Sequence, residues 1–177
     1  MNLILRLLRV FITALLKPRI EVLDTSELSF RVLPTDLDIN MHMTNARYLS
    51  IMDLGRTDLL IRAGMLGLVV RERWLPVVGS INIMFRLSLS PFQRFSVKTR
   101  LMCWDKKWLY MEQRLESDIG VHSIATVRGL FRGPKGSVPS KTLLDRMRYN
   151  GETPPFPPEV ICLLDWEALH KKARGTS

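Results

Sequence analysis

The chain has 177 residues, of which 46% are hydrophobic, and its 26 Lys and Arg residues outnumber its 17 Asp and Glu residues, giving a formal net charge of +9. This length supports one domain with a single sizeable core, and no Pro/Gly-rich or repetitive stretch separates two. The basic excess favours anionic partners such as phosphates, acidic lipid headgroups or nucleic acid. The cysteines, Cys103 and Cys162, lack CxxC spacing. They argue against a zinc site or a disulfide framework and favour buried thiols in the reducing cytoplasm.

The first twenty residues, MNLILRLLRVFITALLKPRI, predict a helix that is apolar except for one narrow stripe. The polar positions of that stripe, at spacings of three and four, are Asn2, Arg6, Arg9, Thr13 and Lys17. The apolar run is shorter than the about 20 residues of a transmembrane span, and no signal-peptide cleavage site follows it. Two interpretations stay open. Residues 1–17 lie in the plane of an anionic membrane, peripheral on its inner face, or the helix packs on its own domain or on a second subunit.

The residues after Pro18 predict an α+β unit. The run LSFRVLP, residues 28–34, alternates as a strand does. The polar segment DLDINMHMTNARYLSIMDLGR, residues 36–56, follows it and leads into a helix from Ala46 to about Ala63. Apolar residues occupy most of the circumference of this helix, so we expect the rest of the domain to wrap around it.

Four strand-like runs come next, at residues 75–90, 95–105, 107–117 and 121–133. The connections between them are short enough for hairpins, so we expect consecutive strands to pair antiparallel. The stretch GPKGS, residues 133–137, lacks the spacing of a phosphate loop and predicts a hairpin turn. Two helical segments end the chain. The sequence therefore divides into an N-terminal helix (1–20), a main domain (21–139) and a C-terminal helical extension (140–177).

The segment that begins the long helix carries a family resemblance. Asp38-Ile-Asn40-Met-His42-Met-Thr-Asn45-Ala-Arg-Tyr48 resembles the D-x-N-x-H-V-N-N-x-x-Y signature of the hotdog-fold acyl thioesterases of the 4-hydroxybenzoyl-CoA thioesterase-like superfamily. The chain differs from the signature where it has Met-Thr in place of Val-Asn. The likeness covers roughly residues 26–135, and the apolar N-terminal helix resembles the branch of the thioesterase-superfamily member 6 type. The resemblance implies an antiparallel sheet of about five strands wrapped around a long central helix.

The polar cluster at residues 38–45 contains the groups that thioester hydrolysis requires. A carboxylate can attack or activate water, and N–H groups at a helix start can stabilise an oxyanion. The resemblance implies that Asp38 is the nucleophile or general base and that the N–H of Asn45 polarises the carbonyl, with Asn40 and His42 orienting the site. The alternative is structural: Asp38 turns the chain, Asn40 and His42 satisfy the loop, and Asn45 caps the helix. We expect Asp36→Asn to be nearly silent.

Further candidates for substrate binding are Tyr48, Asp53, Arg128, Arg132 and Lys135. Asp53 is either an acid of the site or the partner of Arg56 in an ordinary helical ion pair. The three basic residues near the end of the last strand either meet the phosphates of coenzyme A or phosphopantetheine, or form a solvated strand face. We expect no metal, and no cofactor except coenzyme A as part of the substrate.

A single sheet around one helix leaves strand edges exposed, which predicts a symmetric homodimer, or a tetramer, with each site at a subunit interface. The expected function is hydrolysis of acyl-CoA or acyl-carrier thioesters in fatty acid metabolism. The alternative is a non-catalytic hotdog protein that binds acyl chains or acts as a scaffold at a membrane. Net charge alone suggests nucleic acid, and the chain lacks a basic-aromatic motif for it, so we do not expect a nucleic-acid partner.

Overall fold

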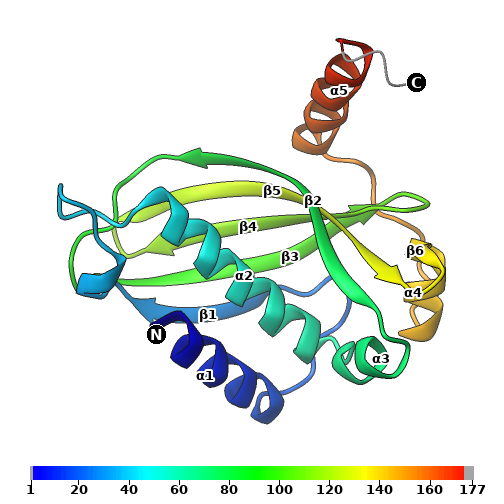
Figure 1. Cartoon of the computed structure of the whole chain (residues 1–177), viewed down its shortest axis with the longest axis horizontal. Coiled ribbons are helices and arrows are strands. Elements are labelled where there is room, and N and C mark those ends of the chain that lie inside the picture. The colour runs from blue at the N-terminus through cyan, green and yellow to red at the C-terminus, as the bar shows by residue number, and fades with distance from the viewer. Residues whose placement is uncertain (1, 174–177) are drawn as a thin grey trace.

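The computed structural model describes residues 2–173 of the chain, and the side chains of residues 3–170. One antiparallel sheet curves around a long central helix, as Figure 1 shows. The helices are α1 (Asn2–Leu16), α2 (Asn45–Arg62), α3 (Leu66–Arg71), α4 (Ser140–Arg146) and α5 (Pro158–Ala173), with a 3-10 turn at Pro34–Asp36. The strands are β1 (Ser26–Arg31), β2 (Leu75–Phe85), β3 (Arg94–Trp104), β4 (Leu109–Ser117), β5 (Gly120–Gly133) and β6 (Gly136–Val138). This is the α+β hotdog arrangement expected from the sequence.

The order of the strands differs from the predicted meander. The main path of the sheet is β1-β3-β4-β5-β2, with β6 paired to β5. Antiparallel pairing of β3 with β4 and of β4 with β5 is as predicted, but the prediction that β2 pairs with β3 is wrong. β1 takes that edge of β3, so residues 86–93 cross the end of the sheet and β2 pairs with β5 instead. The GPKGS hairpin turn is confirmed, since it joins β5 to β6.

Helix α2 lies directly on the sheet. It begins at Asn45, and its cap is Thr44, whose hydroxyl accepts a hydrogen bond from the Arg47 N–H at 3.3 Å, so the prediction of Asn45 as the cap is wrong. Gly55 in the middle of α2 touches the strands, because a Cβ added there would stand 2.6 Å from the Thr99 hydroxyl and 3.1 Å from the Gln113 amide nitrogen. The core between the first half of α2 and the sheet is continuously packed.

Helix α1 packs against α2 and along the β1 edge of the sheet (Figure 1). Its buried positions, Arg6, Val10 and Ala14, recur every four residues and form one stripe. Of the predicted polar stripe, Arg6 faces the protein's own domain, whereas Arg9 and Lys17 are exposed, as are most of the large apolar side chains of the helix. Within the described residues, no helix has both the length and the apolar character needed to cross a membrane.

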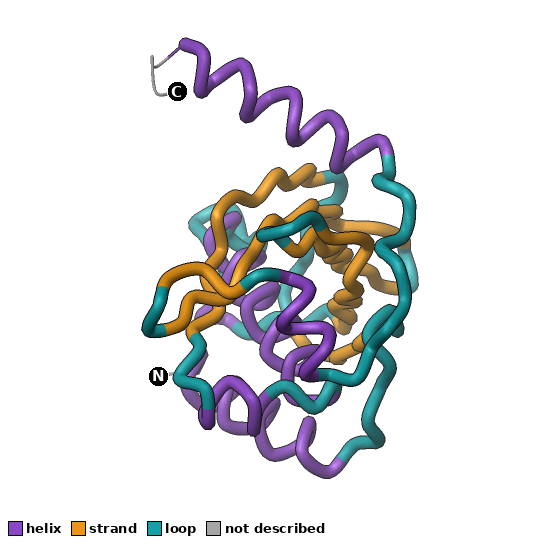
Figure 2. The backbone as a smooth tube through the Cα atoms, turned by 90° about the vertical axis from the view of Figure 1, so that its right-hand side faces the viewer, coloured by secondary structure: helices purple, strands orange, loops and turns teal. Residues whose placement is uncertain are grey.

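Helix α5 covers part of the opposite side of the sheet (Figure 2). Val160 packs in a cluster with Cys103 and Tyr110, and Glu167 forms an ion pair with Arg128. Cys103 is buried, as predicted, but Cys162 is exposed on α5, so the prediction that both thiols are buried is wrong for Cys162. The Pro-rich segment before α5 thus carries the chain around the sheet from the α4 side to its outer face.

Candidate active site

The polar cluster forms a tight hairpin at the start of α2. Leu37 and Met43 pair across its base, and within it the Asp38 N–H donates to the His42 carbonyl at 2.9 Å. The Asp38 carboxylate turns the chain, because its Oδ1 accepts hydrogen bonds from the N–H groups of Asn40 at 2.8 Å and His42 at 3.1 Å. The side chains of Asp38, Asn40 and His42 are all exposed. The hairpin therefore presents a carboxylate, an amide and an imidazole to solvent on one ordered loop.

The start of α2 lies beside this hairpin. The N–H of Thr44, the residue before the helix, donates to the Asp36 carbonyl at 3.0 Å, which ties the two segments together. Asn45 is the first residue of α2, and the first N–H groups of a helix have no acceptor within it and stand at the positive end of its dipole. The arrangement can thus supply an attacking carboxylate and an N–H donor from neighbouring positions. The two roles of Asp38, turning the loop and acting chemically, are compatible, because both loop bonds engage Oδ1.

Asp36, two residues before Asp38, has a different environment. Its side chain is fully buried and forms ion pairs with Arg6 of α1, at 2.6 Å between Nη2 and Oδ2, and with Arg47 of α2, at 3.1 Å between Nε and Oδ1. It also accepts the Leu33 N–H at 2.9 Å. Asp36 therefore joins α1, the loop and α2. We now expect Asp36→Asn to destabilise the fold, since this change would leave two buried or half-buried arginines without their anion.

Tyr48 lies inside the fold. Its hydroxyl donates to the Leu87 carbonyl at 3.3 Å and accepts from the Leu89 N–H at 3.2 Å, and its ring packs edge-on against Phe85. Burial raises the pKa of Tyr48 above that of a free tyrosine, so the hydroxyl stays protonated. These contacts tie α2 to the segment after β2 and leave the Tyr48 hydroxyl occupied by main-chain groups.

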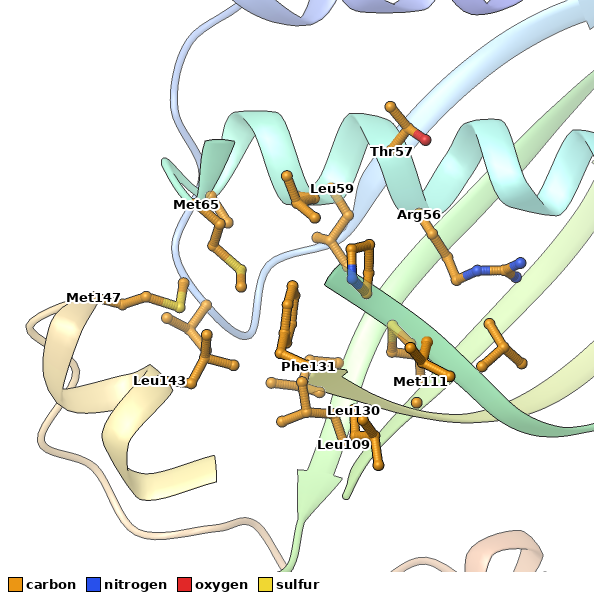
Figure 3. Close-up of a pocket in the computed structure, with 18 of the residues that line it drawn as sticks. Arg56, Thr57, Leu59, Met65, Leu109, Met111, Leu130, Phe131, Leu143 and Met147 are labelled. Atoms are coloured by element: carbon orange, nitrogen blue, oxygen red, sulfur yellow. The ribbon is translucent and has the colours of Figure 1, made fainter. Parts of the chain in front are cut away.

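A pocket of about 230 Å³ lies at the other end of α2, between its second half, the sheet and α4 (Figure 3). Among the described residues that line it, the polar side chains are Asp53, Arg56 and Thr57, all on α2. The remaining walls are apolar and include Leu59, Leu60 and Ala63 of α2, Val77 and Val78 of β2, Phe131 of β5 and Leu143 of α4. The sequence did not predict this pocket, because its walls come from elements far apart in the chain, and each of them alone has the apolar pattern of an ordinary core element.

Asp53 and Arg56 form the ion pair that their spacing predicts, and both line the pocket. The guanidinium of Arg56 also donates to the side-chain oxygen of Gln113, whose amide group is held by the Met52 carbonyl at 2.8 Å and the Thr99 hydroxyl at 2.9 Å. Burial lowers the pKa of Arg56, and the nearby Asp53 carboxylate opposes this shift. The pocket is therefore an apolar cavity with one well-anchored cation at its wall.

Arg128 and Arg132 of β5, and Lys135 in the turn between β5 and β6, lie away from the Asp38 hairpin within one chain. The end of β5 nearer the Asp38 hairpin contains His122, which contacts the Leu87 carbonyl. Arg132 is ten residues further along β5, about 33 Å away for an extended strand. Arg128 is paired with Glu167 and lies 4.0 Å from the Trp108 ring on the outer face, where burial lowers its pKa. Arg132 and Lys135 are exposed. Among the described residues, no group of three or more His, Cys, Asp or Glu side chains could hold a metal ion.

Comparison with known proteins gives the chain a family. A model of the thioesterase-like superfamily matches residues 32–164, a range that includes the hairpin, α2 and strands β2 to β6. The chain belongs to this superfamily. It is 33% identical over 133 residues to Protein THEM6 of Xenopus laevis, and the match covers 73% of this chain and 62% of that protein, so this chain spans less than two thirds of that relative's length.

Solved structures of the superfamily type share the fold. The YbaW probable thioesterase of Escherichia coli superposes with a TM-score of 0.64 at 21% identity, over 68% of this chain and 94% of that one. A Staphylococcus aureus protein solved in complex with CoA, SAV2348, superposes with a TM-score of 0.61 at 17% identity, over 80% of this chain and 95% of that one. At these identities the likeness establishes the hotdog fold of the superfamily and no finer property.

Proposed function

We propose that the protein hydrolyses acyl thioesters at the Asp38 hairpin. The observation that carries the proposal is an exposed carboxylate, ordered by its own loop and tied to the first turn of a buried helix, in a chain of the thioesterase-like superfamily. Asp38 would attack the thioester carbonyl or activate the water that does so. The N–H of Asn45 would donate to the oxyanion, and His42 and Asn40 would shape the loop around it.

The reaction is balanced without any further reagent. Water adds to the carbonyl carbon, directly or after an acyl group has passed through the Asp38 carboxylate, and the carbon–sulfur bond breaks. The sulfur leaves with the bonding electrons and takes a proton from the attacking water, which gives a free acid and a thiol. No metal is required by this chemistry, because the helix start supplies the positive potential that the oxyanion needs.

The acyl group needs an apolar site, and the Asp38 hairpin of the same chain does not supply one. The hairpin lies at the first turn of α2, whereas the pocket lies beside its second half, and the whole helix of 18 residues is about 27 Å long. Packed core fills the space between the two. We therefore assign the acyl group to the pocket of a second subunit.

Strand β2 supports this assembly because it is an open edge of the sheet with exposed apolar side chains. β2 runs opposite to α2: Phe85 packs on Tyr48 near the helix start, and Val77 lines the pocket near the helix end. If two copies pair antiparallel through β2, the end of one β2 lies beside the beginning of the other. The hairpin of each subunit then comes next to the pocket of its partner, in a symmetric homodimer or a tetramer built from such dimers.

Coenzyme A is the carrier that we propose, with an acyl-carrier protein as the alternative. The net charge of +9 suits the phosphates of either carrier, and SAV2348, of the same fold, is solved with CoA. In the proposed dimer, the exposed Arg132 and Lys135 lie at the pocket end of β5 and so on the side of the partner's hairpin. The same basic residues would serve as the phosphate-binding positions, while Arg128 stays with Glu167.

A hydrolysis screen tests the function directly. We expect one class among short, medium, long and aromatic acyl-CoAs to be turned over with a clear optimum, measured by release of free thiol. The apolar walls of the pocket predict an aliphatic or aromatic acyl group over a charged one. Saturable binding of acyl-CoA without hydrolysis of any member of the panel would favour the non-catalytic acyl-binding protein, in which the Asp38 carboxylate only turns its loop.

Mixed dimers test the shared site. We expect Asp38→Asn and Ala63→Phe each to abolish most activity, the first by removing the carboxylate and the second by filling the pocket. Chains of the two kinds, co-expressed, should recover roughly one quarter of the wild-type activity, because about half of the dimers are mixed and each mixed dimer rebuilds one complete site. Recovery of none, or a monomer at micromolar concentration in sedimentation, would refute a site shared between subunits.

A further inference from the structure

Helix α1 exposes most of its large apolar side chains to water. Six of its apolar side chains are between 50 and 81% exposed, namely Ile4, Leu5, Leu8, Ile12, Leu15 and Leu16. They lie on the side of the helix opposite the buried stripe of Arg6, Val10 and Ala14. A helix on the surface of a globular domain ordinarily buries its apolar face and exposes its polar one. Something other than water must therefore cover this face when the protein is in its working environment.

Hydrogen bonds from Arg6 and Lys17 hold the inner face of α1 to the domain. The Arg6 guanidinium bonds to both oxygens of Asp36 and to the Arg31 carbonyl at 3.0 Å. Lys17, just past the end of the helix, donates to the Glu27 carbonyl at 3.2 Å. Rotating α1 to bury its apolar face would break these bonds and leave Asp36 in the core with only Arg47 as its cation. The orientation of α1 is thus fixed by charge pairing on its inner side.

The chemistry of the exposed face selects its occupant. Its six side chains contain no hydrogen-bonding group over the whole length of the helix, whereas a protein–protein interface carries about one hydrogen bond per 100–200 Å². Cations flank the face: Arg9 is exposed on α1, and Lys17 and Arg19 follow it, while residues 2–20 contain no acid. An apolar stripe bordered only by positive charge matches the boundary between acyl chains and anionic headgroups.

We propose that α1 lies in the interface of an anionic membrane, with this apolar face among the acyl chains and its inner face locked to the domain. Because Asp36 also holds Arg47 and the loop before Asp38, the membrane would fix the orientation of the whole domain rather than hold it on a flexible tether. This combines the two interpretations that the sequence left open, an anionic membrane surface and packing on the protein's own domain. The helix packs on its own domain through the stripe of Arg6, Val10 and Ala14, and its opposite, apolar side is offered to lipid.

The test is sedimentation of the whole chain with vesicles of equal parts phosphatidylcholine and phosphatidylserine. We expect the wild-type protein to bind, less tightly at high salt and less tightly to phosphatidylcholine alone. The double variant Leu8→Gln, Ile12→Gln should bind at least about a hundredfold more weakly, since each buried aliphatic side chain contributes about tenfold or more to partition. Its melting temperature should not fall, because both side chains are exposed.

The matched control is Ile119→Gln, Leu169→Gln, which removes two apolar side chains of similar exposure, 62 and 68%, away from α1. This variant should bind vesicles as the wild-type protein does. Equal vesicle binding by the α1 variant, or failure of the wild-type protein to bind, overturns the proposal. So does a wild-type oligomer that the α1 variant dissociates without any effect of lipid, which would show that a second copy covers the face. Hydrolysis of a short, soluble acyl-CoA is assayed separately, so failure of this proposal leaves the proposed function standing.

Discussion

Replacing Asp38 with asparagine should lower turnover of the best acyl thioester by roughly two or more orders of magnitude, the scale expected when a nucleophile or general base is lost. The structure makes this a clean substitution. The side-chain oxygen of asparagine can still accept the N–H bonds of Asn40 and His42, so the hairpin keeps its shape and only the charge is removed. Steady-state kinetics, with thermal unfolding beside them, separate lost chemistry from lost fold.

The control is Asp118→Asn, which changes another exposed loop aspartate, in the turn between β4 and β5, and should leave turnover unchanged. His42→Ala should cost less than Asp38→Asn, since the main-chain N–H of His42, not its side chain, holds the loop. Full activity of the Asp38→Asn enzyme would show that the carboxylate is only a turn former, and that the mechanism built on this hairpin is wrong.

Replacing Asp36 with asparagine should lower the free energy of unfolding by about 3 kcal/mol, the lower end of the range for removing one partner of a buried ion pair. The change removes the anion shared by Arg6 and Arg47, and the Arg6 side chain is almost fully buried. Urea denaturation measures the loss as a lower midpoint with an unchanged slope.

The matched control is Asp145→Asn, which breaks the exposed helical pair of Lys141 and Asp145 on α4 and should change stability by less than about 0.5 kcal/mol. If Asp36→Asn were as mild as this control, the buried pairs would contribute little, and α1 would be held by its remaining contacts with α2 and β1. A variant with residues 36 and 145 both changed should show additive losses, because the two pairs share no partner.

Much of the fold follows from local sequence patterns. The central helix is predicted to within a residue of its observed start at Asn45, and its observed end at Arg62 lies next to the predicted end, which Gly64 indicates. Strand positions followed from alternation, but the pairing of β2 did not. A short connection such as SPFQ suggests a hairpin, and only the competition of β1 for the edge of β3 shows that β2 must pair elsewhere. Pairing is a property of the whole sheet, which no single stretch of sequence encodes.

Only part of the candidate site could be predicted from the sequence. The hairpin of Asp38 could be predicted because its residues are contiguous and the loop is held by its own main chain. The sequence alone does not show that Asp36 is buried and Asp38 exposed, however, because Arg6, the ion-pair partner of Asp36, lies 30 residues away in the chain. The pocket could not be predicted, because its walls come from five or more elements. One of these is α4, whose Leu143 and Leu144 indicate only a short helix in the sequence.

The close contact of Gly55 with the sheet limits where the proposed acyl pocket can change its length. At this point α2 rests on the side chains of Thr99 and Gln113 with no room for even a Cβ, and Gln113 in turn holds Arg56, which lines the pocket. A side chain larger than glycine at residue 55 would push α2 off the sheet, so this end of the pocket is the one least open to substitution. Changes of specificity during evolution would therefore arise at the opposite wall, where Leu143, Leu144 and Met147 of the α4 region can shorten or lengthen one at a time.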